Sequence, residues 1–194
     1  MRRRTFDVLV SVAGLVLALV LAAAGGLLLW GNSFVNNQVS TQLSAQKIVF
    51  PTKTNAEFKA LPPADQAAMG QYAGQLMTTG AQAHVYADNF IAFHLSKMGG
   101  TYSQLSAKAQ AQPANTTLAN LVNTVFKGTT LRGMLLNAYA FWQMGQIALV
   151  AAIVSFIGAG LLLILTILGF IHARITAPAT EFLTGRHPQT VTAS

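Results

Sequence analysis

The sequence contains no cysteine and very few charged residues. The absence of cysteine excludes disulfide bridges, thiol nucleophiles and cysteine-ligated metals. Only 9% of the residues are charged and only five are acidic, whereas about 25% of the residues in a typical soluble domain are charged. The scarcity is greatest in two apolar runs, but it extends into the segment between them, which is rich in Ala, Gln, Asn and Thr.

The net charge of +7 does not by itself indicate nucleic-acid binding. The basic residues are dispersed, apart from Arg2-Arg3-Arg4, and no basic stripe alternates with aromatic residues. Cationic residues beside an apolar run instead favour the cytoplasmic face of a membrane and its anionic lipids. Membrane lipids are therefore the expected partners of these charges.

Two long apolar runs lie toward the two ends of the chain. No charged side chain occurs from Val8 to Leu29, or from Gly133 to Ile171, where the strongest part begins near Ile147. A helix needs about 20 apolar residues to cross the hydrocarbon of a bilayer, and it satisfies its own backbone hydrogen bonds there. The runs predict transmembrane helices at residues 8–30 and 144–172.

The arginines predict the topology of a two-pass protein of the cell membrane. Arg2-Arg3-Arg4 immediately precede the first run, which assigns residues 1–7 to the cytoplasm. Two spans return the C-terminus to the same side, so residues 173–194, with Arg174 and Arg186, form a short cytoplasmic tail. Residues 31–143 are then an extracytoplasmic, mainly helical domain.

A cleaved signal peptide is the competing interpretation of the N-terminus. Arg2-Arg3-Arg4 would be its basic region, Val8 to Leu21 its apolar region, and Ala22-Ala23-Ala24 its cleavage site. Against cleavage, apolar residues continue to Trp30, which suits an anchor at the water–lipid boundary. An uncleaved signal anchor is the preferred interpretation.

Small residues recur along both apolar runs. Such strips let helix backbones approach closely in a membrane, where lipid supplies no hydrophobic drive. They predict contact between the two spans, or contact with a protein partner or with further copies of the chain, although Ala and Gly are also common background residues in membrane helices. The two strips are Gly14, Ala18, Ala22 and Gly26, and Ala148, Ala152, Ser155 and Ala159. Because no ionisable residue lies inside either run, a proton relay or ion pathway is not expected.

The central segment predicts short helices after a linker at Asn32–Lys59. Helical periodicity or composition marks residues 64–77, 81–98 and 102–110, and no strand is expected. A further helix begins near Leu118, is interrupted or bent at Gly128, and resumes after Thr129-Thr130 toward the second span. The predicted fold class is an all-α membrane protein, with two transmembrane helices flanking a small extracytoplasmic helical bundle.

The clearest polar pair in the central segment is His84 and Asp88. Their spacing of four puts them on one helix face, where they favour a hydrogen bond. A metal needs three or four convergent ligands, so metal binding is the less favoured interpretation. His94 lies on an apolar stripe, and we expect it to be a hydrogen-bonded histidine in the core or at its boundary.

The remaining polar residues do not form a recognisable catalytic pattern. Glu57, Asp65 and Asp88 are far apart in sequence, and no spacing pairs them for acid–base work. Lys127 and Arg132 could meet lipid phosphates, but a solvated pair at a helix end is the simpler interpretation. We therefore assign no catalytic, cofactor-binding or metal-ligating residue, expect no cofactor, and predict that the chain is not an enzyme.

Three segments of the chain resemble an actinobacterial family of two-span membrane proteins. They are Arg3-Arg4-Thr5-Phe6-Asp7-Val8-Leu9-Val10, Tyr86-Ala87-Asp88-Asn89-Phe90-Ile91 and the run from Gly128 to Trp142. The family has no established activity, so the resemblance implies no functional residues. Its members often carry an automatic label as a subunit of an aromatic-ring-opening dioxygenase. The sequence does not support that label, because such chemistry needs iron held by histidines and a carboxylate.

The span–domain–span order is also similar to bacterial chemoreceptors and sensor kinases. Arg174-Ile175-Thr176-Ala177-Pro178 resembles the opening of a HAMP signalling linker, but the chain ends at Ser194 before an effector domain. Two functional hypotheses follow. The first is an accessory or structural membrane subunit that binds partner proteins through its external domain and its spans. The alternative is a ligand-sensing module that lacks its own effector.

Overall fold

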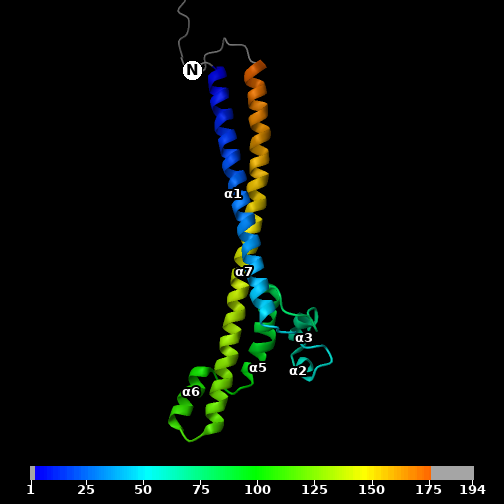
Figure 1. Cartoon of the computed structure of the whole chain (residues 1–194), viewed down its shortest axis with the longest axis vertical. Coiled ribbons are helices and arrows are strands. Elements are labelled where there is room, and N and C mark those ends of the chain that lie inside the picture. The colour runs from blue at the N-terminus through cyan, green and yellow to red at the C-terminus, as the bar shows by residue number, and fades with distance from the viewer. Residues whose placement is uncertain (1–2, 176–194) are drawn as a thin grey trace, which may run out of the picture. The chain divides into compact units, whose positions relative to one another are not determined.

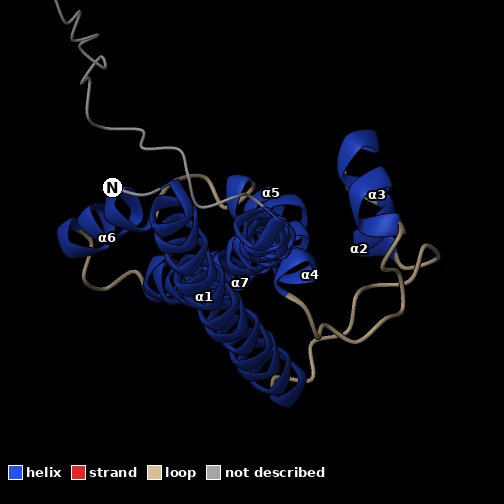
Figure 2. Cartoon of the chain, turned by 90° about the horizontal axis from the view of Figure 1, so that it is seen from above, coloured by secondary structure: helices blue, strands red, loops and turns tan. Residues whose placement is uncertain are grey.

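The structure, a computed structural model, describes residues 3–175 of the chain (Figure 1). Arg2 and the segment from Thr176 onward lie outside the described residues. That segment includes Arg186 and most of the HAMP-like motif. Within residues 3–175 every regular element is a helix, as the fold class predicted, and none is a strand (Figure 2).

Two long helices dominate the described chain. Helix α1 spans Arg3–Ala45 and helix α7 spans Thr116–Ile175. None of the six prolines falls within either helix, so nothing removes a backbone donor from them. Both are long and apolar enough to cross a membrane, and only 17% and 11% of their most apolar windows is buried within the protein. A core helix of a water-soluble protein would instead be mostly buried.

Helix α1 continues through the first part of the predicted linker, so that prediction is wrong up to Ala45. The seam on this part of the helix includes Asn32 and Asn36, whose side chains bond to each other at 2.7 Å. These polar residues hide the helical period that Val39 and Leu43, both buried, continue. The helix ends where Lys47 takes the left-handed conformation with φ 53°.

Six short elements connect the long helices. They are α2 (Ala56–Lys59), α3 (Pro63–Gly70), α4 (Gly80–Val85), the π-helix η1 (Tyr86–Ile91), α5 (Ala92–Ser96) and α6 (Tyr102–Ala111). Thr79 and Thr101 form capping boxes with the glutamines three residues later, which explains where α4 and α6 begin. The helices predicted at residues 81–98 and 102–110 are confirmed, the first with a π-helical middle.

The helix predicted at residues 64–77 is only half correct. Helix α3 ends at Gly70, and the residues that follow pair in an extended conformation with the chain after α1. The Phe50 N–H donates to Gln75 O at 2.9 Å, and the Met77 N–H donates to Ile48 O at 2.8 Å. This pairing buries Phe50 and Met77, which outweighs a weak local preference for helix.

Helix α7 is continuous past the glycine and threonines that were expected to interrupt it. It is preceded by Asn115, whose Oδ1 accepts a hydrogen bond from the Leu118 N–H at 3.0 Å. Gly128 instead provides a contact point, since a Cβ there would lie 2.9 Å from Leu95 Cδ2. The lack of a side chain allows α5 to approach α7 at this level.

The chain divides into two units, each with its own packing. One unit contains residues up to Leu29 and from Leu149 onward, and the other contains Trp30–Ala148. In the first unit, α1 and α7 are antiparallel. Ser11 lies against Gly169, Gly14 against Thr166, and Gly25 against Phe156, so that ascending positions on α1 meet descending positions on α7.

The second unit has a solid apolar core. Phe50, Met69 and Met77 are fully buried side chains, and Leu43 and Leu135 pack into the same cluster. These residues come from α1, α3, α7 and the extended pair, so the core ties the short elements to both long helices. Around this core, the contacts do not by themselves establish the small bundle that the sequence suggested.

Gly80 and Gly133 offer a matched pair of tests for this packing. At Gly80 a Cβ would lie 2.2 Å from Trp142 Cβ, so Gly80→Ala must displace α4 from α7. We expect it to lower the free energy of unfolding by about 1–3 kcal/mol. At Gly133, on α7, a Cβ meets nothing within 4 Å, and Gly133→Ala should stabilise by about 0.5–1 kcal/mol through helix propensity. Equal effects in denaturant melts of the two variants would contradict the packing described.

Candidate functional site

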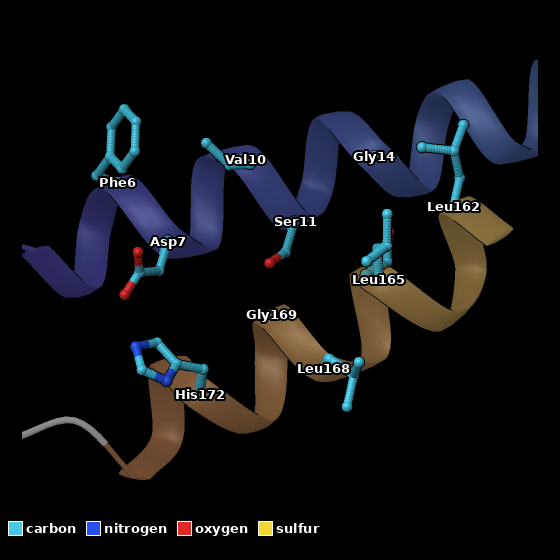
Figure 3. Close-up of a pocket in the computed structure, with 11 residues that line it drawn as sticks. Phe6, Asp7, Val10, Ser11, Gly14, Leu162, Leu165, Leu168, Gly169 and His172 are labelled. Carbon is cyan, nitrogen blue, oxygen red and sulfur yellow. The ribbon is translucent and has the colours of Figure 1, made fainter.

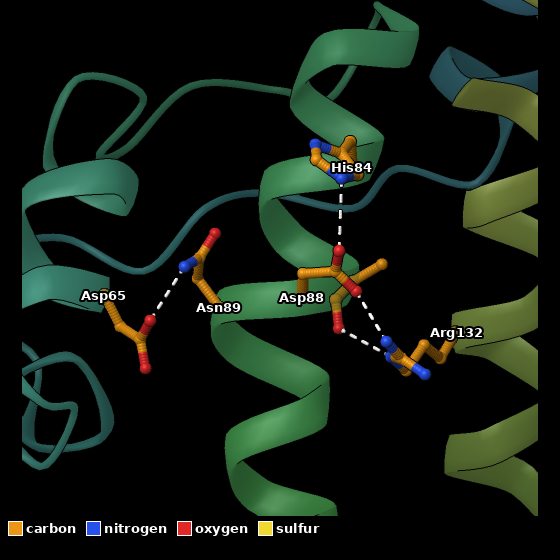
Figure 4. Close-up of polar contacts among 6 residues, drawn as sticks. Asp65, His84, Asp88, Asn89 and Arg132 are labelled. Atoms are coloured by element: carbon orange, nitrogen blue, oxygen red, sulfur yellow. Dashed lines mark hydrogen bonds and ion pairs between the residues drawn. The ribbon is translucent and has the colours of Figure 1, made fainter. Parts of the chain in front are cut away.

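A polar network connects α4, η1 and α7 in the second unit (Figure 4). His84 Nε2 lies 3.1 Å from Asp88 Oδ2, so the predicted contact of this pair is confirmed. Arg132 Nη2 donates to Asp88 Oδ1 at 2.6 Å. All three side chains are more than a third exposed, so the ion pair contributes at most about 1 kcal/mol. Its main effect is to fix the position of Asp88.

Arg132 also anchors the π-helix. Its Nε donates to Ala87 O at 3.3 Å, and the same carbonyl accepts the Ala92 N–H that closes η1. The expectation that Arg132 would be part of a solvated pair at a helix end is therefore wrong. Arg132 lies within α7, and although partly exposed it bonds to residues 44 and 45 positions earlier in the sequence. π-Helical turns are rare overall, but those that occur are often found at functional sites. The segment η1 is therefore a candidate part of a functional site.

The network holds its carboxylate in a way that disfavours catalysis or metal binding by Asp88. Both of its oxygens have partners, and the His84 ring stacks on Tyr139 at 4.2 Å between centroids. Asp65, on the other side of η1 in Figure 4, accepts a hydrogen bond from Asn89 at 2.7 Å. Within residues 3–175, no three His, Asp or Glu side chains converge as metal ligands.

His94 makes the hydrogen bond expected of a histidine at the core boundary. Its Nδ1 lies 2.8 Å from Phe90 O, and its ring packs between Phe90 and Phe93 at 4.4 and 5.4 Å. The prediction of a satisfied histidine is confirmed.

A groove lies between α1 and α7 in the second unit. We call it the glutamine groove, since Gln38, Gln42 and Gln46 line one side of it at steps of four residues. Its volume is about 520 Å³, and the rest of its lining is almost entirely apolar. Phe34, Met134 and Phe141 border it and are each more than half exposed. Exposed apolar side chains gathered along one groove make it a candidate interaction surface.

The small-residue strips predicted in the two spans meet the facing helix only in part. Ala18, Ala152 and Ala159 are buried, and Gly14 lies against Thr166, but Gly26 has nothing within 4 Å of where its Cβ would be. Steps of four residues drift by about 40° each around a helix, whereas steps of seven return to within about 20° of the same face. The buried seam therefore follows sevens. It comprises Ser11, Ala18 and Gly25 on α1, and Ala152, Ala159, Thr166 and Ala173 on α7.

A second cavity, the polar cleft, opens along this seam in the first unit (Figure 3). It has a volume of about 460 Å³. Small and hydroxyl side chains lie between its apolar walls, and Asp7 and His172 point toward each other at its end. Asp7 Oδ2 and Thr166 Oγ1 are buried and have no hydrogen-bond partner.

Sequence reasoning named Gly14 of the polar cleft in a small-residue strip, but it did not single out Asp7, Thr166 or His172. A signal was nevertheless present. Asp7 directly precedes the first apolar run and His172 directly follows the second, and two antiparallel spans bring those positions to the same end. Because both lie just outside the apolar runs, a search for ionisable residues inside the spans passes over them.

A comparison of the chain with protein-family models, with curated proteins and with solved structures finds no match in any of the three. The function must therefore be inferred from the described residues and their geometry.

The buried position of Tyr86, in η1, can be tested by the pH dependence of stability. Burial, and secondarily the Glu57 carboxylate, raise the pKa of Tyr86 above its ordinary value of 10.0. Its stabilising contribution is therefore complete below the unfolded pKa and is lost as pH rises through the folded pKa. Tyr86→Phe should remove this part of the alkaline decline in melting temperature, measured between pH about 9 and 12. Tyr102→Phe, at an exposed position, is the control; indistinguishable profiles of the Tyr86 variant and the parent would contradict the assignment.

Proposed function

We propose that this chain is a two-pass integral membrane protein, with spans at residues 8–30 and 144–172. The support is that α1 and α7 are long and apolar and that most of their apolar side chains face outward, where only lipid would stabilise them. By the positive-inside rule both termini are cytoplasmic, and residues 31–143 form a small helical domain on the extracytoplasmic side of the membrane. The motif residues from Gly128 to Trp142 support membership of the actinobacterial two-span family.

Within that topology, the chain acts as a non-enzymatic accessory or structural subunit that binds a partner protein. The observation that carries this proposal is the glutamine groove. Its apolar side chains are exposed although the adjacent core, with Phe50, Met69 and Met77, is completely filled. Apolar surface that the domain does not need for its own folding is best explained by a partner that covers it.

The shape and chemistry of the groove suit a helix as the occupant. From Phe34 to the end of α1 at Ala45 the groove follows about 16 Å of the helix, which matches a partner helix of about three turns. A helix laid between two antiparallel helices would bury an apolar stripe against Phe34, Met134 and Phe141, the exposed apolar residues of the groove. The glutamine side chains beside it are uncharged donors and acceptors, so the partner helix should carry polar, uncharged residues next to its apolar stripe.

Membrane insertion can be tested independently of partner binding. We expect the chain to remain in membranes after carbonate extraction, since two spans hold it there. A reporter fused after Ser194 should be active only in the cytoplasm, and one inserted near Pro62 only outside. Release by carbonate, or a mature chain that begins after Ala24, would contradict the proposed topology.

The groove can be tested with a photoreactive amino acid at Gln42, which lines it. In cells this position should crosslink to one polypeptide, through a helical segment of that polypeptide. The double variant Leu131→Gln with Met134→Gln should lower the crosslinking yield about tenfold, because it removes central apolar anchors while preserving helix propensity.

Phe126→Gln, at an exposed position on the same helix but outside the groove, is the matched control and should leave the yield unchanged. Equal yields from the double variant and the parent would contradict partner binding in this groove. A small molecule recovered from the groove without any crosslinked polypeptide would also contradict it and would favour the ligand-sensing hypothesis.

A further inference from the structure

The polar cleft contains polar atoms that the protein itself leaves unpaired. Thr166 is 4% exposed and its Oγ1 has no hydrogen-bond partner. Asp7 is partly exposed, but its Oδ2 is enclosed and also has no partner. A buried polar atom without a partner is unfavourable by about 1–3 kcal/mol. Both residues line the same cavity of about 460 Å³. The two atoms themselves are enclosed, so an occupant of the cavity reaches them through rotation of the two side chains.

The cleft is amphipathic. Ser11, Gly14, Thr166 and Gly169 bring small and hydroxyl groups together where the helices meet, while Val10 and Leu165 on the walls are more than half exposed. An occupant must therefore combine apolar chains along the walls with polar groups inside. Carboxylates accept hydrogen bonds only, so the group of the occupant that meets Asp7, beside His172, must be a donor, preferably a cationic one.

We propose that the polar cleft binds the headgroup of a membrane lipid that carries a primary ammonium. The ammonium donates to the Asp7 carboxylate, and rotation about the Asp7 Cβ–Cγ bond exchanges the two oxygens, so either can face the cleft. Deeper in the cleft, the Thr166 hydroxyl donates to an ester carbonyl of the lipid. This inference rests on the proposed function, because it requires α1 and α7 to cross a bilayer.

The spacing of the two polar positions slightly exceeds the thickness of the headgroup layer of one leaflet. Thr166 lies six residues before His172, at the level of Asp7, which is about 9 Å along α7. The headgroup layer of one leaflet is about 5–8 Å thick, with the ester carbonyls at its inner edge. A lipid standing upright in the cleft therefore meets Asp7 with its ammonium and Thr166 near its esters, while its chains continue along the wall formed by Leu162 and Leu165.

The test compares lipids that differ only at the ammonium. The full chain, purified from membranes in mild detergent, is mixed with equal amounts of phosphatidylethanolamine, phosphatidylcholine and phosphatidylglycerol with identical chains. Bound lipid is then measured by native mass spectrometry. We expect ethanolamine lipid to be retained about tenfold over choline lipid, since the trimethylated ammonium has the same charge but no N–H donor.

Variants assign the preference to the cleft. Asp7→Asn should reduce retention of the ethanolamine lipid to the level of the choline lipid, and the isosteric Thr166→Val should weaken it without loss of helix content. Asp88→Asn makes the same chemical change at a carboxylate outside the cleft and should leave the preference intact. Equal retention of phosphatidylethanolamine and phosphatidylcholine by the parent chain would overturn the proposal.

A preference that survives in Asp7→Asn would also overturn it, as would crosslinking that finds a lysine of another polypeptide beside Asp7. Carbonate extraction of the same variants separates the two levels of inference. A chain that stays in membranes but shows no headgroup preference refutes the lipid site alone, whereas a chain released by carbonate refutes the two-pass topology on which the site depends.

Discussion

Close packing of small residues at seven-residue intervals is the constraint on which this structure depends. In the first unit the positions that α1 and α7 bury are Ser, Ala, Gly and Thr, without a single large side chain among them. A seven-residue repeat keeps one face of a helix directed at its neighbour with a drift of only about 20° per repeat. In lipid, where apolar burial gives no drive, the stability of such a pair comes from van der Waals contact between closely approaching backbones. The large apolar side chains of both helices are consequently left to face outward.

Glycines set the approach of helices in the second unit as well, but there they admit large partners. Trp142 packs over Gly80, and Leu95 packs over Gly128. Each contact joins a short element to α7, and each depends on the absence of a Cβ. The short helices are too small to be stable alone, since helices below about 12 residues are marginal in water. Their order comes from such docking and from the shared core around Phe50 and Met77.

The long apolar elements were predictable because their signals are local. Runs without charge, and the four-residue spacing of His84 and Asp88, act within a few positions of the sequence. The extension of α1 to Ala45 was not predicted, and a linker was expected instead, because Asn32 and Asn36 occupy seam positions at which a helical period is recognised by apolar residues. The extended pairing that ends α3 early, and the contact of Arg132 with η1, depend on residues distant in the sequence. A single sequence contains no local signal for either.

The candidate sites illustrate the same division. The apolar residues of the glutamine groove can be identified in the sequence, but their exposure cannot. It depends on which of them are buried in the core around Leu43 and Leu135. The polar cleft was open to prediction in principle, since opposite ends of antiparallel spans must meet. The unpaired oxygen atoms of the cleft could not be predicted, because a missing hydrogen bond can be recognised only when the positions of all neighbouring atoms are known.

The carboxylates of this chain are so few that the contrast between them is informative. Asp88 is satisfied by Arg132 and His84, and Asp65 by Asn89, because the second unit has several elements that can bring a donor to each. In the first unit only two helices are available, and the seam that joins them is built from small residues whose side chains do not reach Asp7 Oδ2. Among the described residues the first unit has no third element that could supply a donor to Asp7 Oδ2, and His172, which faces Asp7, does not pair with that oxygen. In the proposed topology, the donors present in quantity at the edge of an apolar span are water and lipid headgroups.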